Sequence, residues 1–138
     1  MMFKQRVLSR YRIVSYEDYK TLNDPGDRIP SLAKGKTEIW YAKNTRDLGL
    51  GYTWCKEHKL LPDVKNLEAT HVLVGKVKET DLDKIFYVMQ GEIWSRNGEA
   101  RHLISSLGIN HTSMSVGDVV KVGNKYQIVD RDGFKELG

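Results

Sequence analysis

Cysteine, proline and long apolar stretches are scarce in this chain of 138 residues. Its one cysteine, Cys55, cannot form a disulfide within the chain, which is typical of a reducing compartment. No apolar run approaches the roughly 20 residues that a membrane-spanning helix needs. The basic N-terminal stretch surrounds only Val7 and Leu8, too short an apolar core for a secretory signal peptide. These absences predict a cytoplasmic protein with no membrane partner.

Size and composition predict a single folded domain. Hydrophobic residues make up 40% of the chain and charged residues 29%, a mixture that excludes wholesale disorder. A chain of this length buries roughly 68% of its unfolded surface, so its core needs neither a disulfide nor a metal for stability.

The net charge of +4 is concentrated at the N-terminus. Residues 1–60 hold 12 Lys or Arg and 7 Asp or Glu, whereas the remainder holds 10 and 11. Lys4, Arg6, Arg10 and Arg12 all precede the first acidic residue, Glu17. This basic arm is compatible with phosphate contacts, and equally with a charged end that only meets solvent.

Short runs of β-branched and aromatic residues between turn formers predict about five strands. They cover Thr37–Ala42, His71–Lys78, Asp118–Val122, Tyr126–Asp130 and Phe134–Leu137. The second run begins apolar on both faces, so we expect it to be a central strand. The third and fourth form a hairpin around Gly123 and Asn124.

Two apolar stripes at helical spacing predict two core helices. The first helix is expected to begin at a Thr80 cap and to end at Gly91, with Asp81 and Asp83 in its first turn. The second is expected to begin at an Asn97 cap and to end at Gly108. The stripes consist of Leu82, Ile85, Phe86 and Met89, then Ala100, Leu103, Ile104 and Leu107.

These elements predict an α+β fold: one domain with a mixed or antiparallel sheet, or a partial barrel, and two core helices. Residues 1–36 form a basic N-terminal extension with a short helix from Ser15 to Leu22, and residues 37–138 form the domain. The segment Lys43–Asn66 has no clean periodicity, which indicates either a binding loop or a misread helix.

The sequence predicts neither a metal site nor a cofactor. Cys55 and His58 have the spacing that places two ligands on one helix face, but a closed zinc site needs four ligands. The remaining histidines, His71, His102 and His111, supply no second pair.

The loop His111–Ser115 resembles a catalytic string, because Ser113 and Ser115 lie near His111 and Asp118 follows. Neighbours in sequence seldom form a working nucleophile and base, because the fold must position the base. We therefore expect Thr112, Ser113 and Ser115 to satisfy backbone groups of the loop, and Asp118 to cap the turn at Gly117. No catalytic residue is assigned.

Aromatic residues with basic neighbours favour a nucleic-acid surface as an alternative. Bases stack on such rings in many single-strand binding proteins. Alternation along the strand sends Trp40 and Tyr41 to opposite faces, so at least one of them is expected to be exposed. The candidate residues for this surface are Arg6, Arg10, Arg12, Trp40, Lys43, Arg46 and Trp54.

Three strings carry a resemblance to a known family: Met89–Arg101, with Asn-Gly-Glu-Ala-Arg at its end; His111–Val120, with His-Thr-Ser-Met-Ser-Val-Gly-Asp; and Gly133–Phe134. With the strand at Glu38–Tyr41, they resemble small proteins of bacteriophages and mobile elements, similar to the YodL-like domains of large phage and plasmid proteins. The resemblance covers roughly residues 37–138. It implies a role in establishing the element or countering host defence, since the family has no settled activity.

The string Val116–Val120 also resembles the closing hairpin of PUA-like barrels, which often bind RNA or modified bases. Our expectation from the sequence is a non-enzymatic phage or mobile-element protein that binds a host protein or a small anionic or nucleotide ligand. The alternative is a PUA-like module that binds nucleic acid. The candidate ligand-binding residues are Arg101, His102, His111, Thr112, Ser113 and Ser115.

Overall fold

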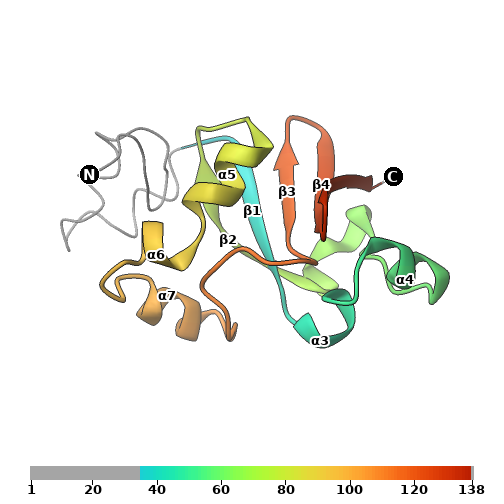
Figure 1. The fold of residues 1–138 in the computed structure, drawn as a ribbon, viewed down its shortest axis with the longest axis horizontal. Helices are drawn as coiled ribbons and strands as arrows, with labels where there is room; N and C mark the ends of the chain where they lie inside the picture. The colour runs from blue at the N-terminus through green and yellow to red at the C-terminus, as the bar shows by residue number, and fades with distance from the viewer. Residues whose placement is uncertain (1–34, 138) are drawn as a thin grey trace.

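A computed structural model of the protein describes residues 35–137. Its centre is a five-stranded, wholly antiparallel open sheet with strand order β2-β1-β3-β4-β5 (Figure 1). The strands are β1 (Thr37–Ala42), β2 (His71–Val77), β3 (Val119–Val122), β4 (Lys125–Asp130) and β5 (Gly133–Leu137). The α+β class and the five strands expected from the sequence are confirmed. The predicted extension and its helix lie outside the described residues.

The middle strand is β3, and β1 lies beside it as an interior strand that pairs with both β2 and β3. The sequence prediction of a central position for β2 is wrong, because β2 lies at an edge of the sheet and pairs only with β1. Val74 and Val77 of this strand are buried in the main core, and its first residue, His71, is also buried. A bulge between Ile39 and Trp40 shifts the register of this pair.

The segment between β1 and β2 is ordered as three short helical pieces, not as one long loop. They are α3 (Thr45–Leu48), α4 (Tyr52–Glu57) and the 3-10 helix η1 (Val64–Ala69). Asn44 caps α3 by accepting hydrogen bonds from the backbone of Arg46 and Asp47. Each piece is only four to six residues long, so no apolar stripe repeats often enough to reveal it in the sequence.

Three helices follow β2: α5 (Leu82–Val88), α6 (Gly91–Trp94) and α7 (Arg101–Ser106). The predicted first cap is wrong by one residue, because Asp81 and not Thr80 accepts the amides of the first turn. Gly91 starts a further helix instead of ending the first. Asn97 does not cap α7; its backbone and side-chain nitrogens bind Glu99, and α7 begins without a side-chain cap.

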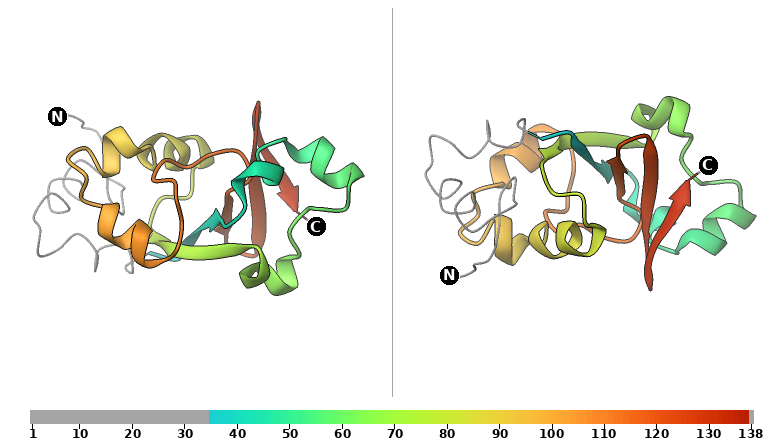
Figure 2. Two further views of the ribbon diagram at one scale, coloured as in Figure 1. Left: turned by 90° about the horizontal axis from the view of Figure 1, so that it is seen from below. Right: turned by 90° about the horizontal axis from the view of Figure 1, so that it is seen from above.

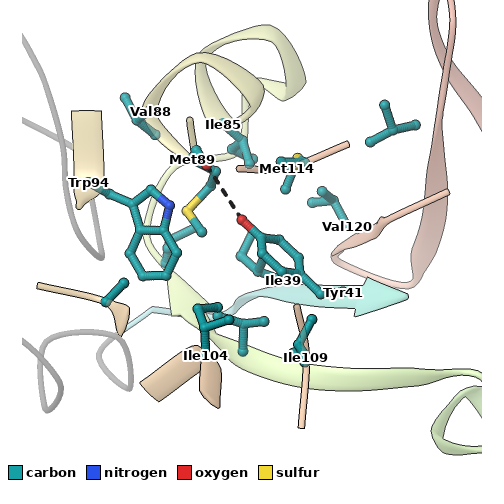
Figure 3. Close-up of a cluster of buried hydrophobic side chains, with 14 residues drawn as sticks. Ile39, Tyr41, Ile85, Val88, Met89, Trp94, Ile104, Ile109, Met114 and Val120 are labelled. Atoms are coloured by element: carbon teal, nitrogen blue, oxygen red, sulfur yellow. Dashed lines mark hydrogen bonds between the residues drawn. The ribbon is translucent and has the colours of Figure 1, made fainter. Parts of the chain in front are cut away.

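The helices cover the two faces of the sheet unequally. Helices α5, α6 and α7 gather on one side of the strands, and α3, α4 and η1 on the other (Figures 1 and 2). The larger core lies on the first side, where Ile39 and Tyr41 of β1 pack against Ile85, Met89 and Trp94 (Figure 3). Four aromatic or sulfur-containing side chains of this core are fully buried: Tyr41, Met89, Trp94 and Met114, the last of which belongs to the loop after α7.

A smaller core lies on the opposite face. Val119 and Ile128 of the β3–β4 hairpin are buried there with Leu67 of η1 and Leu137 of β5, and Trp40 packs against this cluster. The expected separation of Trp40 and Tyr41 onto opposite faces is confirmed, since they pack in different clusters. The expectation that at least one of them is exposed is wrong, because Tyr41 is fully buried and Trp40 half-buried. Within residues 35–137, none of the helices has the length and apolar character to cross a bilayer.

Candidate functional site

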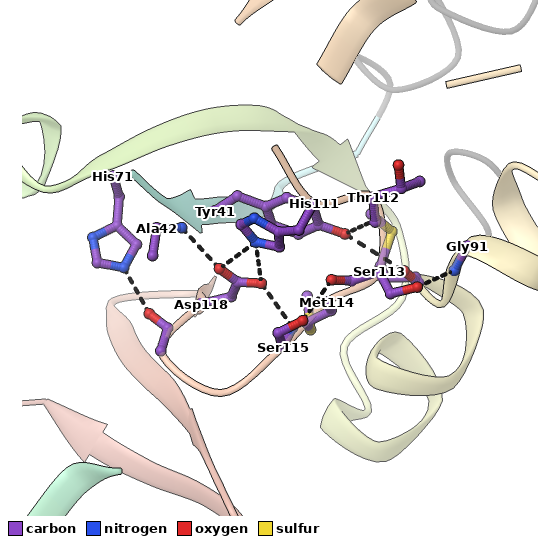
Figure 4. Close-up of polar contacts among 12 residues, drawn as sticks. Tyr41, Ala42, His71, Gly91, His111, Thr112, Ser113, Met114, Ser115 and Asp118 are labelled. Carbon is purple, nitrogen blue, oxygen red and sulfur yellow. Dashed lines mark hydrogen bonds and ion pairs between the residues drawn. The ribbon is translucent and has the colours of Figure 1, made fainter. Parts of the chain in front are cut away.

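Asp118 is the most constrained polar residue of the loop between α7 and β3. Its side chain is fully buried, yet both carboxylate oxygens have donors. Oδ1 accepts the backbone N–H of Ala42 at 2.8 Å, and Oδ2 accepts that of Ser115 at 2.8 Å. His111 Nε2 lies 3.0 Å from each oxygen (Figure 4). We call Ala42, His111, Ser115 and Asp118 the clasp, since together they join the loop to β1.

The imidazole of His111 is fixed on its other sides by β1. Its ring stacks on that of Tyr41, with centroids 4.6 Å apart and planes inclined by 17°. Because Nε2 faces a carboxylate, it carries a proton. Nδ1 is buried and has no hydrogen-bond partner among the described residues. The clasp therefore places Nε2 of His111 against a carboxylate and not against a hydroxyl.

The two serine hydroxyls of the loop, and the hydroxyl of Tyr41 beside it, form hydrogen bonds within the fold. Tyr41 Oη donates to the Thr112 carbonyl at 2.7 Å, and Trp94 Nε1 donates to the same oxygen at 3.0 Å. Ser113 Oγ accepts the backbone N–H of Gly91 at 2.7 Å, and Ser115 Oγ donates to the Ser113 carbonyl at 2.9 Å. The bond of Ser115 matches the expectation that these side chains satisfy loop backbone groups. Ser113 instead accepts from the backbone of Gly91 at the start of α6, and Thr112 takes part through its carbonyl and not its hydroxyl.

A second buried histidine supports the same loop. His71 Nε2 lies 2.8 Å from the Gly117 carbonyl, and Thr70 Oγ1 lies 2.8 Å from Nδ1. A carbonyl can only accept, so Nε2 carries the proton and Nδ1 accepts from Thr70. Burial lowers the pKa of His71 from its ordinary value, so this neutral tautomer is favoured.

Burial also shifts the pKa values of Asp118 and of the neighbouring Tyr41. It raises the pKa of the Asp118 carboxyl, and the hydrogen bonds from His111, Ala42 and Ser115 oppose that rise. The pKa of Tyr41 is raised by burial and then by the charge of Asp118, which keeps its hydroxyl protonated as a donor. The arrangement suits a buried carboxylate held by three donors.

The structure does not unite the six predicted ligand-binding residues into one site. His111, Thr112, Ser113 and Ser115 share the loop and take part in internal bonds. Arg101 and His102 are exposed on α7, and no hydrogen bond connects their side chains to that loop within the described region. The six therefore form two separate features.

The predicted nucleic-acid residues are also dispersed. Arg6, Arg10 and Arg12 lie outside the described residues. Trp40 lies in the sheet, with Nε1 donating to Glu38 at 2.9 Å. Lys43, Arg46 and Trp54 belong to the region of α3 and α4, where Lys43 Nζ donates to the Glu68 carbonyl.

The pair of residues with metal-like spacing has other partners. Cys55 is buried, its Sγ donates to the Asp47 carbonyl at 3.4 Å, and burial raises its pKa. The ring of His58 stacks on that of Trp54 with centroids 3.9 Å apart, and its Nδ1 lies 2.8 Å from the Trp54 carbonyl. No group of three potential metal ligands occurs in residues 35–137.

Two open hollows on either side of the turn between β4 and β5 were not anticipated from the sequence. The α5 hollow has a volume of about 290 Å³ and is lined by Asp83, Phe86, Val129, Asp130, Arg131, Gly133 and Phe134. The α4 hollow has a volume of about 360 Å³ and is lined by Leu50, Gly51, Tyr52, Thr53, Trp54, Asp130, Arg131 and Asp132. Asp130 and Arg131 line both, so the hollows adjoin.

Local bonds fix the wall between the two hollows. Asp130 Oδ1 accepts the backbone N–H of Tyr52 at 3.0 Å, which ties α4 to the end of β4. Gly51 has φ of +104°, and a Cβ there would lie 3.3 Å from Asp130 Oδ1 and 3.7 Å from Arg131 Nε. Glycine is thus required for both its backbone conformation and the close approach of these side chains.

Sequence reasoning missed this region because its lining comes from three separate segments. Asp130 was predicted only as the end of a strand, and Trp54 only as part of a nucleic-acid surface. The available signal was the dense alternation of charge in Asp130–Asp132 directly after a strand. It was uninformative until the fold brought α4 and α5 to either side of it.

Comparison of the chain with protein-family models, with curated proteins and with solved structures finds no match.

Proposed function

We propose that the chain is a non-enzymatic binding protein of a phage or mobile element. It acts in the bacterial host cytoplasm on a host protein, in the service of host takeover or counter-defence. The origin in a phage or mobile element, and hence the bacterial host, is proposed from the family resemblance of residues 37–138. The binding role is supported by one observation above others: two adjoining hollows open on the surface, whereas the serine hydroxyls near His111 are used in internal bonds.

Exposed apolar side chains near the hollows support a protein partner. Leu50, which lines the α4 hollow, is 42% exposed, and Tyr87, next to Phe86 in α5, is 56% exposed. Aromatic anchors beside polar groups are common at the centre of protein interfaces.

Position-specific photo-crosslinking tests this proposal. p-Benzoylphenylalanine in place of Thr53, an exposed residue of the α4 hollow, should yield a nuclease-resistant crosslink to a host protein. The matched control is the same substitution at Ser105, which is exposed on α7 outside both hollows. Equal crosslinks from the two positions, or none from Thr53, would overturn the proposal. Thermal stabilisation by a nucleotide or cyclic nucleotide would favour a small ligand instead.

A second candidate function, nucleic-acid binding, is favoured by one row of the sheet. Lys76, Glu38, Lys121 and Tyr126 pair across four adjacent strands and so share a face. Lys121 Nζ lies 5.4 Å from the centroid of the Tyr126 ring, and Trp40 is bonded to Glu38 on the same face. Bases stack on such rings while lysines neutralise phosphates.

Fluorescence anisotropy with a labelled oligothymidine tests this candidate. Binding should weaken steeply with salt and further in the double variant K76Q/K121Q. Binding that persists in that variant, or that ignores salt, would exclude this face. The comparable control is K65Q, which removes an exposed lysine from η1.

A further inference from the structure

The two hollows concentrate negative charge on a domain that is otherwise almost balanced. Residues 35–138 hold 15 Lys or Arg and 14 Asp or Glu. The hollows are lined by three carboxylates, Asp83, Asp130 and Asp132, and by a single basic side chain, Arg131. An acidic surface of this kind on a chain of net charge +4 favours a cationic partner over nucleic acid or an anionic nucleotide.

Each hollow also presents aromatic rings beside its carboxylates. Phe86 and Phe134 line the α5 hollow, and Tyr52 and Trp54 line the α4 hollow. Lys56 Nζ already lies 6.0 Å from the centroid of the Tyr52 ring, so this ring accepts a cation within the chain. Aromatic faces and carboxylates together are the groups that bind a guanidinium or an ammonium ion.

The aspartates of the hollows are accessible to a cationic group of a partner. The hydrogen bond from the Tyr52 N–H lowers the pKa of Asp130, so its side chain is charged at neutral pH. Only Oδ1 of Asp130 is used in that bond, and Asp83 and Asp132 are exposed. The pair that Asp132 forms with Lys135, at 3.7 Å, is itself exposed and contributes little, so a partner can displace it.

We infer that the two hollows bind a basic segment of the partner protein, with arginine or lysine side chains over the aromatic rings and against the aspartates. Arginine is favoured over lysine, because its planar guanidinium both stacks on rings and donates two parallel hydrogen bonds to a carboxylate. This inference rests on the proposed function and specifies the chemistry of the partner.

The test uses the full chain, labelled with ¹⁵N, and three synthetic peptides with capped ends: Arg-Leu-Arg-Leu-Arg-Leu, its glutamine counterpart and its glutamate counterpart. The arginine peptide should shift the amide signals of Thr53, Arg131 and Asp132, and the Trp54 indole signal. The glutamine peptide should bind more weakly and the glutamate peptide not at all. The double variant D83N/D132N should weaken arginine binding by about fivefold, and E92Q, an exposed control on α6, should leave it unchanged.

Three results would overturn the inference: equal binding of the glutamate peptide, shifts confined to α7 or to the sheet, or equal losses in D83N/D132N and E92Q. Failure here is separable from failure of the proposed function. A crosslink from Thr53 together with no response to the arginine peptide would reject the basic segment as the ligand but still support a host protein as the partner. The absence of both the crosslink and the peptide response would reject the inference and the proposed function alike.

Discussion

The loop before β3 and the turn after β4 contain similar residues and use them in opposite ways. In the loop, Asp118 is fully buried and each of its oxygens is bonded to backbone amides and to His111. In the turn, Asp132 is exposed, and Asp130 accepts the backbone N–H of Tyr52 with one of its two oxygens. Polar groups that bond within the fold stabilise it, whereas polar groups left at a hollow are available to a partner. This contrast supports a structural role for the clasp and the proposed binding role for the hollows.

Removal of the buried carboxylate should have the largest effect. Asp118→Ala leaves the N–H groups of Ala42 and Ser115, and Nε2 of His111, without their acceptor. We expect a loss of about 3–5 kcal/mol in the free energy of unfolding, measured by urea denaturation. Asp132→Asn is the matched control and should change it by less than about 0.5 kcal/mol. Similar losses of stability in the two variants would contradict the claim that the loop is structural and the turn is not.

Removal of the tyrosine hydroxyl should have a smaller effect. Tyr41→Phe keeps the ring that stacks on His111 and deletes the donor to the Thr112 carbonyl. We expect a loss of about 1–2 kcal/mol by the same measurement. An unchanged stability would show that the bond contributes nothing to the position of the loop.

Acid should weaken the fold through His71. Its pKa in the folded chain lies below the ordinary 6.5, so the unfolded chain binds more protons between the two values. This contribution is fully present above 6.5 and is lost as the pH falls to the lowered pKa. Unfolding free energies measured across this window should depend less on pH in His71→Gln than in the natural chain. The same dependence in both would refute a neutral, buried His71, and His102→Gln is the exposed control.

The smallest effect on stability should come from the hollows themselves. D83N/D132N alters two exposed carboxylates, so its unfolding free energy should stay within about 0.5 kcal/mol of that of the natural chain. Yield of the crosslink from Thr53 should nevertheless fall. A large loss of stability in this variant would mean that the turn, like the loop, is primarily structural.

Local signals predicted the sheet well. Strand β1 and the β3–β4 hairpin follow from alternation between turn formers, both of which depend on neighbouring residues. The position of β2 was missed because strand order depends on the pairing of Trp40 with Val119, residues far apart in the sequence. Helices α3, α4 and α6 were missed because four to six residues show no period.

The candidate sites were predicted less well for a related reason. The loop from His111 to Asp118 was correctly interpreted as internal bonding, since serine beside a turn favours that role. The hydrogen bond from the Ala42 N–H to the Asp118 carboxylate was not predicted, because Ala42 lies in β1, far from Asp118 in the sequence. Nothing local in the sequence places Trp54 and Phe86 on either side of Arg131.

The central claim is that the clasp is structural and the hollows bind the partner. The most direct test measures the crosslink from Thr53 in His111→Gln, with folding checked by near-ultraviolet circular dichroism. The account predicts a crosslink yield equal to that of the natural chain, because His111 contacts Asp118 and Tyr41 and lines neither hollow. A folded His111→Gln protein that has lost the crosslink would contradict it.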